Sequence, residues 1–163
     1  MKAAVVYHSE SGKTAKMGGL IVEGLQTNPG IEAKAFSIDS LDADFVKESR
    51  VILVGTPVYT GTFSGKMKTW LETGTRSLNM GGKLAGAFAT ANFIHGGADV
   101  AILGILNHFM VYGSLVYSGG VAFGQPFIHY GPVAIGPEVE NFSDLFKAYG
   151  QRVGQKAAEL FKD

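Results

Sequence analysis

The hydroxyl side chains Ser9, Ser11 and Thr14 stand close together near the amino terminus, with Gly12 between them. An apolar run over residues 2–7 precedes them, and a sequence compatible with a helix follows directly. This order predicts a buried strand that leads into a helix N-terminus, where unpaired backbone N–H groups and the helix dipole favour a phosphate. The hydroxyls could act as further donors, and the glycine would let the backbone approach an anion closely. We therefore predict an anion site in this segment.

Two other interpretations of the same segment are open. Gly12-Lys13-Thr14 looks like the end of a nucleotide P-loop, but that motif needs a glycine five residues earlier, where this chain has Tyr7. A plain turn with a capping serine is compatible with any strand–helix junction. The spacing of three hydroxyls, all able to point at one anion, favours the phosphate site.

Two more loops follow apolar runs and carry unusual residues. Thr56–Thr62 follows the predicted strand Arg50–Gly55, and Ala91–Gly97 follows the predicted strand Leu84–Thr90. The first loop is a proline turn with a tyrosine, which could form one wall for a flat ring. Each loop alone could be an ordinary connection, so a shared site requires that the loops converge in the fold.

The composition excludes several classes of protein. Fourteen basic and fourteen acidic residues cancel, whereas a nucleic-acid surface normally needs a basic excess. The chain has no cysteine, and its four histidines show no metal-ligand spacing, so we expect no metal site. The segment between Asp99 and Glu138 carries no Asp, Glu, Lys or Arg, but glycines and polar residues interrupt it, so we expect no membrane insertion. With no signal peptide evident, we expect a cytoplasmic protein.

Apolar strand-like runs and helix-like runs alternate five times along the 163 residues, which predicts one domain over residues 1–163. The expected fold is α/β, a doubly wound, five-stranded parallel sheet of flavodoxin-like order 2-1-3-4-5 with helices on both faces. The loops after strands one, three and four then meet at the switch point of the sheet. The remaining elements are predicted as strands at Ile31–Ile38 and Ser114–Tyr117, helices at Gly12–Gln26, Asp39–Lys47, Phe63–Glu72, Ala98–Val111 and from Asn141 or Ser143 to about Phe161, and an irregular segment at Ser118–Glu140.

The motifs resemble those of a known family. Ser9-Glu-Ser-Gly-Lys-Thr14 is similar to the flavodoxin phosphate loop, and Gly55-Thr-Pro-Val-Tyr-Thr-Gly61 resembles a WrbA-type NAD(P)H:quinone oxidoreductase, as do Gly82–Ala85 and His95-Gly-Gly97. The resemblance implies FMN as the cofactor, with its phosphate at the first loop and its ring between the other two. The implied cofactor-binding residues are Ser9, Glu10, Ser11, Gly12, Lys13, Thr14, Pro57, Val58, Tyr59, Thr60, Gly61, Thr90, Ala91, Asn92, Phe93, His95, Gly96 and Gly97.

The resemblance also implies a reaction, the two-electron transfer from NADH or NADPH to a quinone-like acceptor. Candidate ring or acceptor walls are Tyr59, Phe93 and Tyr112, the last of which precedes Gly113 where the family has a histidine. Phe127 and Tyr130 are further candidates for the quinone slot, although each aromatic could equally be a core or interface residue.

Two other functions are open. One is a flavodoxin-type electron carrier, which has no substrate of its own and docks redox proteins; the other is a regulatory or scaffolding flavin protein. The neutral charge favours an enzyme or an oligomer, because the resemblance implies that such carriers are typically acidic.

Apolar residues surround most of the predicted helix Ala98–Val111. Burial on more than one side would explain this. We expect either a homo-oligomer contact through this helix or the Phe123–Tyr130 segment, or a helix covered by the long segment of the same subunit.

Overall fold

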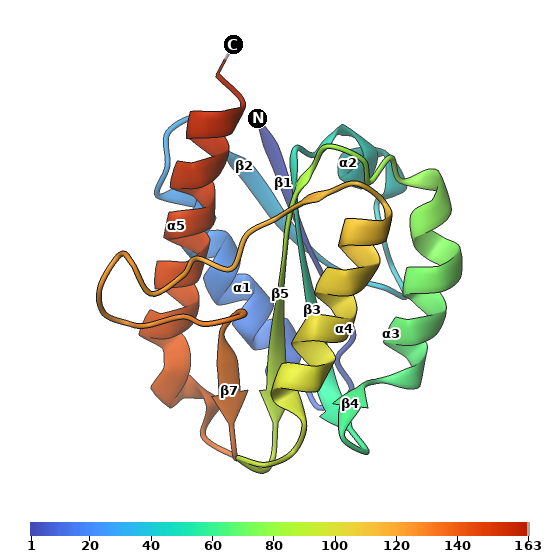
Figure 1. Ribbon diagram of the computed structural model, residues 1–163, viewed down its shortest axis with the longest axis vertical. Coiled ribbons are helices and arrows are strands. Elements are labelled where there is room, and N and C mark those ends of the chain that lie inside the picture. The colour runs from blue at the N-terminus through green and yellow to red at the C-terminus, as the bar shows by residue number, and fades with distance from the viewer. Residues whose placement is uncertain (163) are drawn as a thin grey trace.

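The computed structural model describes residues 1–162, and it shows a parallel sheet between two layers of helices (Figure 1). The strands are β1 (Lys2–Tyr7), β2 (Glu32–Ser37), β3 (Val51–Tyr59), β4 (Thr62–Phe63), β5 (Leu84–Ala91), β6 (Leu115–Val116) and β7 (Val133–Ile135). The helices are α1 (Lys13–Gln26), α2 (Ala43–Glu48), α3 (Gly65–Thr69), α4 (Ala98–Val111) and α5 (Ser143–Leu160). The other helical segments are η1 (Trp70–Gly74), which is a π-helix, and the 3-10 helices η2 (Thr75–Ser77) and η3 (Val139–Phe142).

The strand order is β2-β1-β3-β5-β6, with β4 beside β3 and β7 beside β5. β1 pairs in parallel with both β2 and β3, and β3 pairs in parallel with β5. The predicted doubly wound order 2-1-3-4-5 is therefore confirmed. Because parallel strands run in one direction, the ends of β1, β3 and β5 lie at the same edge of the sheet.

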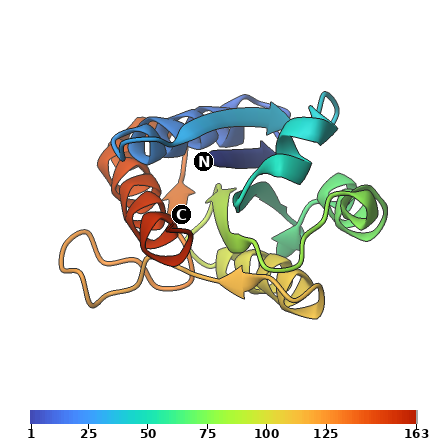
Figure 2. The same cartoon turned by 90° about the horizontal axis from the view of Figure 1, so that it is seen from above.

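Alternate residues of the strands pack in two separate hydrophobic cores, one on each face of the sheet. Ala4 and Val6 of β1 pack in the core beneath α2, α3 and α4, whereas Ala3 and Val5 pack in the core beneath α1 and α5. The period of two is what a strand buried on both faces requires. Figure 2 shows α1 and α5 on one face of the sheet and α3 and α4 on the other.

The third strand is longer than predicted. Residues 56–59, expected as the start of a loop, continue the strand: Pro57 pairs with Thr90 of β5, and Tyr59 pairs with Thr62 across a two-residue hairpin. Proline is compatible with an extended backbone, since its fixed φ lies in the extended range. The predicted helix Phe63–Glu72 starts later because Ser64 caps it, accepting a hydrogen bond from the Met67 N–H at 3.2 Å.

The fifth strand of the sheet is split into two short pieces. β6 pairs with the first part of β5, and β7, which lies inside the segment expected to be irregular, pairs with the last part. The predicted caps of the last helix are also wrong: Asn141 donates to Glu138, and the Ser143 hydroxyl donates to the Glu140 carbonyl instead of accepting from the helix.

Arg152 of α5 holds the segment between β6 and β7. Its guanidinium is nearly buried and donates hydrogen bonds to five backbone carbonyls. These belong to Gly120, Phe123, Gly124, Gln125 and Pro126.

Over residues 1–162, no helix combines the length and the apolar character needed to cross a membrane.

Candidate functional site

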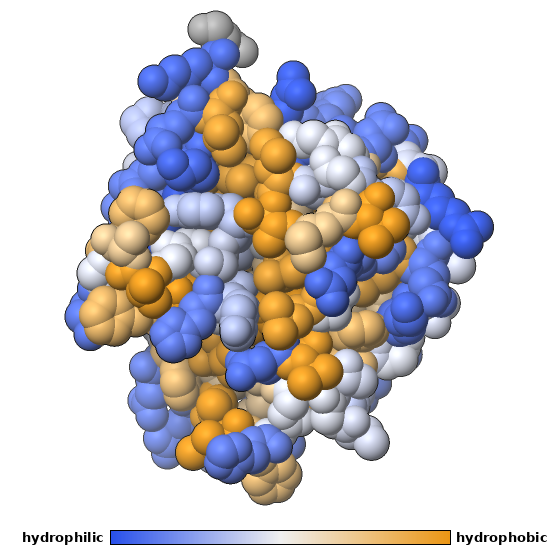
Figure 3. All heavy atoms as spheres, viewed as in Figure 1, coloured by the Kyte–Doolittle hydropathy of each residue, from blue (hydrophilic) through white to orange (hydrophobic). Residues whose placement is uncertain are grey.

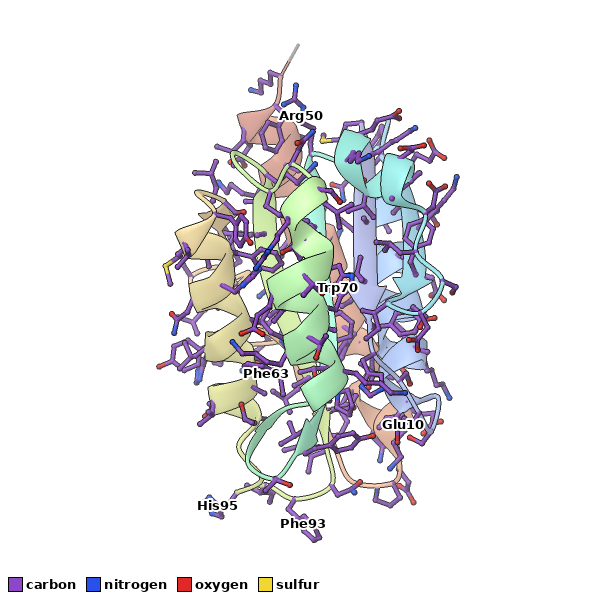
Figure 4. The ribbon with its side chains drawn as sticks, turned by 90° about the vertical axis from the view of Figure 1, so that its right-hand side faces the viewer. Glu10, Arg50, Phe63, Trp70, Phe93 and His95 are labelled. Carbon is purple, nitrogen blue, oxygen red and sulfur yellow. The ribbon has the colours of Figure 1, made fainter. Side chains whose placement is uncertain are left out.

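β1, β3 and β5 end at the bottom of the molecule as drawn in Figure 1. A crevice opens at this end of the sheet. Figure 4 shows Glu10, Phe93 and His95 gathered at this end of the sheet, and Arg50 at the opposite end. The crevice is lined by Ser11, Lys13, Pro57, Val58, Tyr59, Thr90, Ala91 and Asn92. All eight belong to the predicted cofactor-binding set. Seven come from the three loops that the sequence singled out, and Thr90 is the last residue of the predicted strand before the third loop.

The first loop is built to receive an anion. Gly12 precedes α1 with a φ of 84°, and within the described chain α1 has no side-chain cap at this end. The first N–H groups of a helix have no partner inside the helix, so here they are available to a ligand. The Ser9 hydroxyl oxygen is buried and has no hydrogen-bond partner among residues 1–162. An unsatisfied buried hydroxyl beside free N–H groups fits a bound phosphate.

The three predicted hydroxyls do not play equal parts. Ser11 is exposed at the crevice, but Thr14 is buried and its hydroxyl lies 2.8 Å from that of Thr90. This bond joins the first turn of α1 to the end of β5. Lys13 adds a second connection, because its Nζ donates to the Gly136 carbonyl at 3.0 Å and to the Asn92 side chain at 3.5 Å. The phosphate loop is thus tied to the loops after β5 and β7.

The second and third loops touch at their glycines. Gly61 and Gly97 both have positive φ, and a Cβ at Gly97 would lie 2.1 Å from the Gly61 carbonyl oxygen. Only residues without side chains allow so close an approach. Thr60, with a φ of 50°, completes the hairpin between β3 and β4. The resulting contact fixes the two loops that are predicted to hold the ring.

Tyr59 and Glu10 connect the second loop to the first. The Tyr59 hydroxyl donates to Glu10 Oε2 at 3.3 Å, and burial together with the nearby Glu10 carboxylate raises the pKa of Tyr59, so the phenol keeps its proton. Lys66 Nζ lies 4.0 Å from Glu10 Oε1. The wall residue is therefore oriented by a carboxylate of the phosphate loop.

His8 lies beneath this pair. It is almost fully buried, and its Nδ1 lies 2.8 Å from the Ser64 hydroxyl. Its Nε2 is 3.7 Å from Glu10 Oε1 and makes no hydrogen bond within the described residues. Burial lowers the pKa of His8, Lys66 lowers it further, and Glu10 and Asp39 oppose the shift. The imidazole is neutral at pH 7, and its contact with Ser64 joins the end of β1 to the start of α3.

Other predicted site residues do not line the crevice in the structure. Phe93 and His95 are exposed at the tip of the third loop (Figure 4), and Gly96 closes a turn there by donating to the Phe93 carbonyl. Tyr112 follows the last residue of α4, at the end of that helix away from the crevice, and its ring packs against His108. The prediction of Tyr112 as a wall of the site is therefore corrected.

Phe127 and Tyr130 belong to the segment between β6 and β7 and are not among the residues lining the crevice. The predicted quinone slot is thus not assembled from these aromatic residues.

Sequence reasoning missed two parts of the site. His8 was considered only as a metal ligand, although its place at the carboxyl end of β1 puts it directly before the phosphate loop. The Gly136 carbonyl was missed because β7 was not predicted; the apolar run Val133–Ile135 between a proline and a glycine was its signal.

The donors present suit the phosphate of FMN, but the crevice is narrow. Its volume is about 60 Å³, whereas pockets for small molecules hold about 300 Å³ or more. Space for a flavin ring therefore requires the lining of the crevice to open, and Tyr59 and Asn92 are exposed members of that lining. Neither would have to leave the core.

Comparison with known proteins gives consistent matches. The family described as NADPH-dependent FMN reductase matches residues 43–126. A flavodoxin from Clostridium saccharobutylicum is 44% identical over 161 residues, which cover 99% of this chain and 100% of that protein. An NAD(P)H dehydrogenase (quinone) from Chromohalobacter salexigens is 25% identical, with 98% of each chain covered. The crystal structure of the flavodoxin, WrbA-like protein from Agrobacterium tumefaciens superposes with a TM-score of 0.82 at 19% identity, covering 98% of this chain and 99% of that one.

Proposed function

Because the chain belongs to the flavodoxin-like family of FMN-binding flavoproteins, we propose that it is an electron carrier that delivers electrons to and from other redox proteins. The observation that carries this proposal is the exposed apolar tip beside the crevice. Phe93 and Ile94 are 75% and 77% exposed, and Tyr59 is 42% exposed. Apolar and aromatic side chains next to a cofactor site offer a redox protein a docking surface.

FMN, when bound, supplies reversible electron transfer, and the chain's task is to hold and orient it. The first-turn N–H groups of α1, with Ser9 and Ser11, would hold the phosphate. Lys13 lies at the start of the same helix, where its charge would favour an anion. Tyr59, oriented by Glu10, would form one wall for the ring, and backbone groups near Gly61 and residues 91–93 would contact its polar edge.

An NAD(P)H:quinone oxidoreductase is a second candidate. The net charge of zero favours it, since a carrier that is steered to its partners normally has a strong net field. The match to the FMN reductase family and the similarity to a quinone-reducing dehydrogenase also support it. Against it, Tyr112, Phe127 and Tyr130 do not line the crevice, so they offer no second slot beside the ring.

Anaerobic mixing separates the two functions. The FMN-loaded protein is mixed with NADH, NADPH or dithionite while the visible flavin band is recorded, and then with a soluble quinone. A carrier is bleached by dithionite but only slowly by either nicotinamide. Prompt bleaching by NADH or NADPH, followed by repeated turnover with the quinone, would refute the carrier and establish the reductase.

A further inference from the structure

The outward face of α4 carries an apolar stripe. Val100, Leu103, Met110 and Val111 are all exposed, from 37% for Leu103 to 85% for Val111, and Asn107 is exposed between them. The opposite face of α4 packs against the sheet. Its buried residues are Ala101, Ile102, Ile105 and Phe109. The exposed positions are spaced by three and four residues, which is the spacing of a helix that packs against another helix.

Further apolar residues are exposed in the chain after the helix. Leu115 and Val116 of β6 are exposed, as are Val121, Phe123, Phe127 and Tyr130 of the following segment. Figure 3 shows apolar side chains gathered along the middle of the face that carries α4. We call this surface the α4 face. It is not covered by the long segment, so the alternative of a helix buried within one subunit is wrong.

One part of the α4 face beyond the helix, residues 120–126, is held in a fixed shape. The guanidinium of Arg152 binds backbone carbonyls from Gly120 to Pro126, so Phe123 projects from a loop anchored at its base. A surface that is already ordered loses little conformational freedom when it binds. Aromatic residues on such a surface are the ones that most often dominate the energy of an interface.

We propose that the α4 face binds a second copy of this chain, with α4 packed antiparallel against the partner's α4 about a two-fold axis near Asn107. A two-fold interface brings the same patch of both subunits together, so any charge in it would meet a like charge. No charged residue occurs between Asp99 and Glu138, and the α4 face therefore meets its own copy without repulsion.

Asn107 lies near the middle of the stripe, where the axis would cross. A side-chain amide both donates and accepts hydrogen bonds, so Asn107 can pair with its own copy. Antiparallel packing then sets Val100 and Leu103 against the partner's Met110 and Val111. This places apolar side chains on both sides of one polar pair.

The place of the α4 face favours a second copy over a redox protein. α4 begins directly after Gly97 at the crevice and runs away from it for 14 residues, or roughly 20 Å at 1.5 Å per residue. Met110, Val111 and β6 therefore lie toward the far edge of the sheet. The dimer would leave the exposed tip at Phe93 free, and the inference does not depend on which proposed function is correct.

Sedimentation velocity of the FMN-loaded protein from 1 to 100 µM tests the proposal. We expect a dimer, which Met110→Lys converts to a monomer because two like charges would meet a buried apolar contact. Ile94→Lys, the same change at an exposed apolar residue beside the crevice, leaves the dimer intact. Circular dichroism checks that both variants are folded. A wild-type monomer at 100 µM, or a dimer that Met110→Lys leaves unchanged, would overturn the proposal.

The absence of cysteine from the sequence allows a second test of the axis. Asn107→Cys gives each subunit a single thiol next to the two-fold axis, and mild oxidation should convert most of the protein to a disulfide-linked dimer within minutes. Glu23→Cys, on an exposed position of α1, serves as the control and should cross-link slowly. Equal cross-linking rates for the two variants would show that the axis does not pass near residue 107.

Discussion

Removing the buried hydroxyl of Ser9 should affect stability and FMN binding in opposite directions. Its oxygen has no hydrogen-bond partner within residues 1–162, and leaving a buried polar group unpaired costs about 1–3 kcal/mol. Ser9→Ala removes that group. The free energy of unfolding of the FMN-free protein should therefore stay the same or rise by about 1 kcal/mol, although a side chain has been truncated.

The same change should weaken FMN binding. A hydrogen bond to a charged group contributes about 1.5–3 kcal/mol, and 1.4 kcal/mol corresponds to a factor of ten. We expect the Kd for FMN to rise roughly 10- to 100-fold. The Kd for riboflavin, which lacks the phosphate, should not change.

Two measurements on one set of variants check both signs. Urea denaturation of the FMN-free protein gives the stability, and quenching of flavin fluorescence gives the affinities. Ser40→Ala, at an exposed serine of the turn after β2, is the matched control and should change neither quantity. If Ser9→Ala weakens riboflavin as much as FMN, or leaves both affinities at the wild-type level, the phosphate does not reach this hydroxyl.

Three further predictions concern the scaffold. Gly55→Ala should destabilise the protein by about 1–3 kcal/mol, measured by urea denaturation, because the new Cβ would lie 2.0 Å from the Phe88 ring; an unchanged midpoint would contradict the packing described. Arg152→Lys should lower the free energy of unfolding by about 2 kcal/mol or more, since an ammonium cannot reach the five carbonyls that the guanidinium binds. Limited proteolysis of this variant should cut the loop at residues 120–126. If the variant resists proteolysis as well as the wild type does, Arg152 does not hold the loop. Burial lowers the pKa of His8 and of His108 in the folded protein, so the unfolded chain binds more protons just below the ordinary histidine value of about 6.5. The free energy of unfolding should therefore fall as the pH decreases from about 6.5, and His8→Gln should make this decrease smaller. If the free energy of unfolding depends on pH equally in the variant and the wild type, His8 does not contribute to the decrease.

Much of the fold could be predicted because burial on both faces leaves a clear pattern. The run from Val51 to Val54 is apolar throughout, and the chain folds it as a central strand. The bounds of α4 were also predicted, since a glycine pair precedes it and Gly113 follows it. Elements whose pattern depends on long-range pairing were harder to predict.

β7 illustrates this limit. Three residues, Val133–Ile135, carry too short a pattern to be told from a loop, and they form a strand because the end of β5 offers them unpaired backbone groups. The same applies to the extension of β3 through Pro57, which depends on its partner in β5. Only the tertiary structure supplies these partners.

The phosphate loop was predictable for a different reason. Its residues are neighbours in sequence, so spacing alone brings Ser9, Ser11 and Gly12 together. The acceptor side of the site was not predictable in this way. Tyr112 is close to a family motif in sequence but lies at the far end of a 14-residue helix, and the bounds of α4, which were predicted correctly, already place it away from the crevice.

FMN binding is expected to depend most on the phosphate site at residues 9–14. Isothermal titration of the flavin-free wild-type protein with FMN and with riboflavin tests that site directly. We expect FMN to bind at least 100-fold more tightly than riboflavin, because helix N–H groups and two serine hydroxyls would bind the phosphate. Equal affinity for the two flavins, or no binding of FMN, would contradict it.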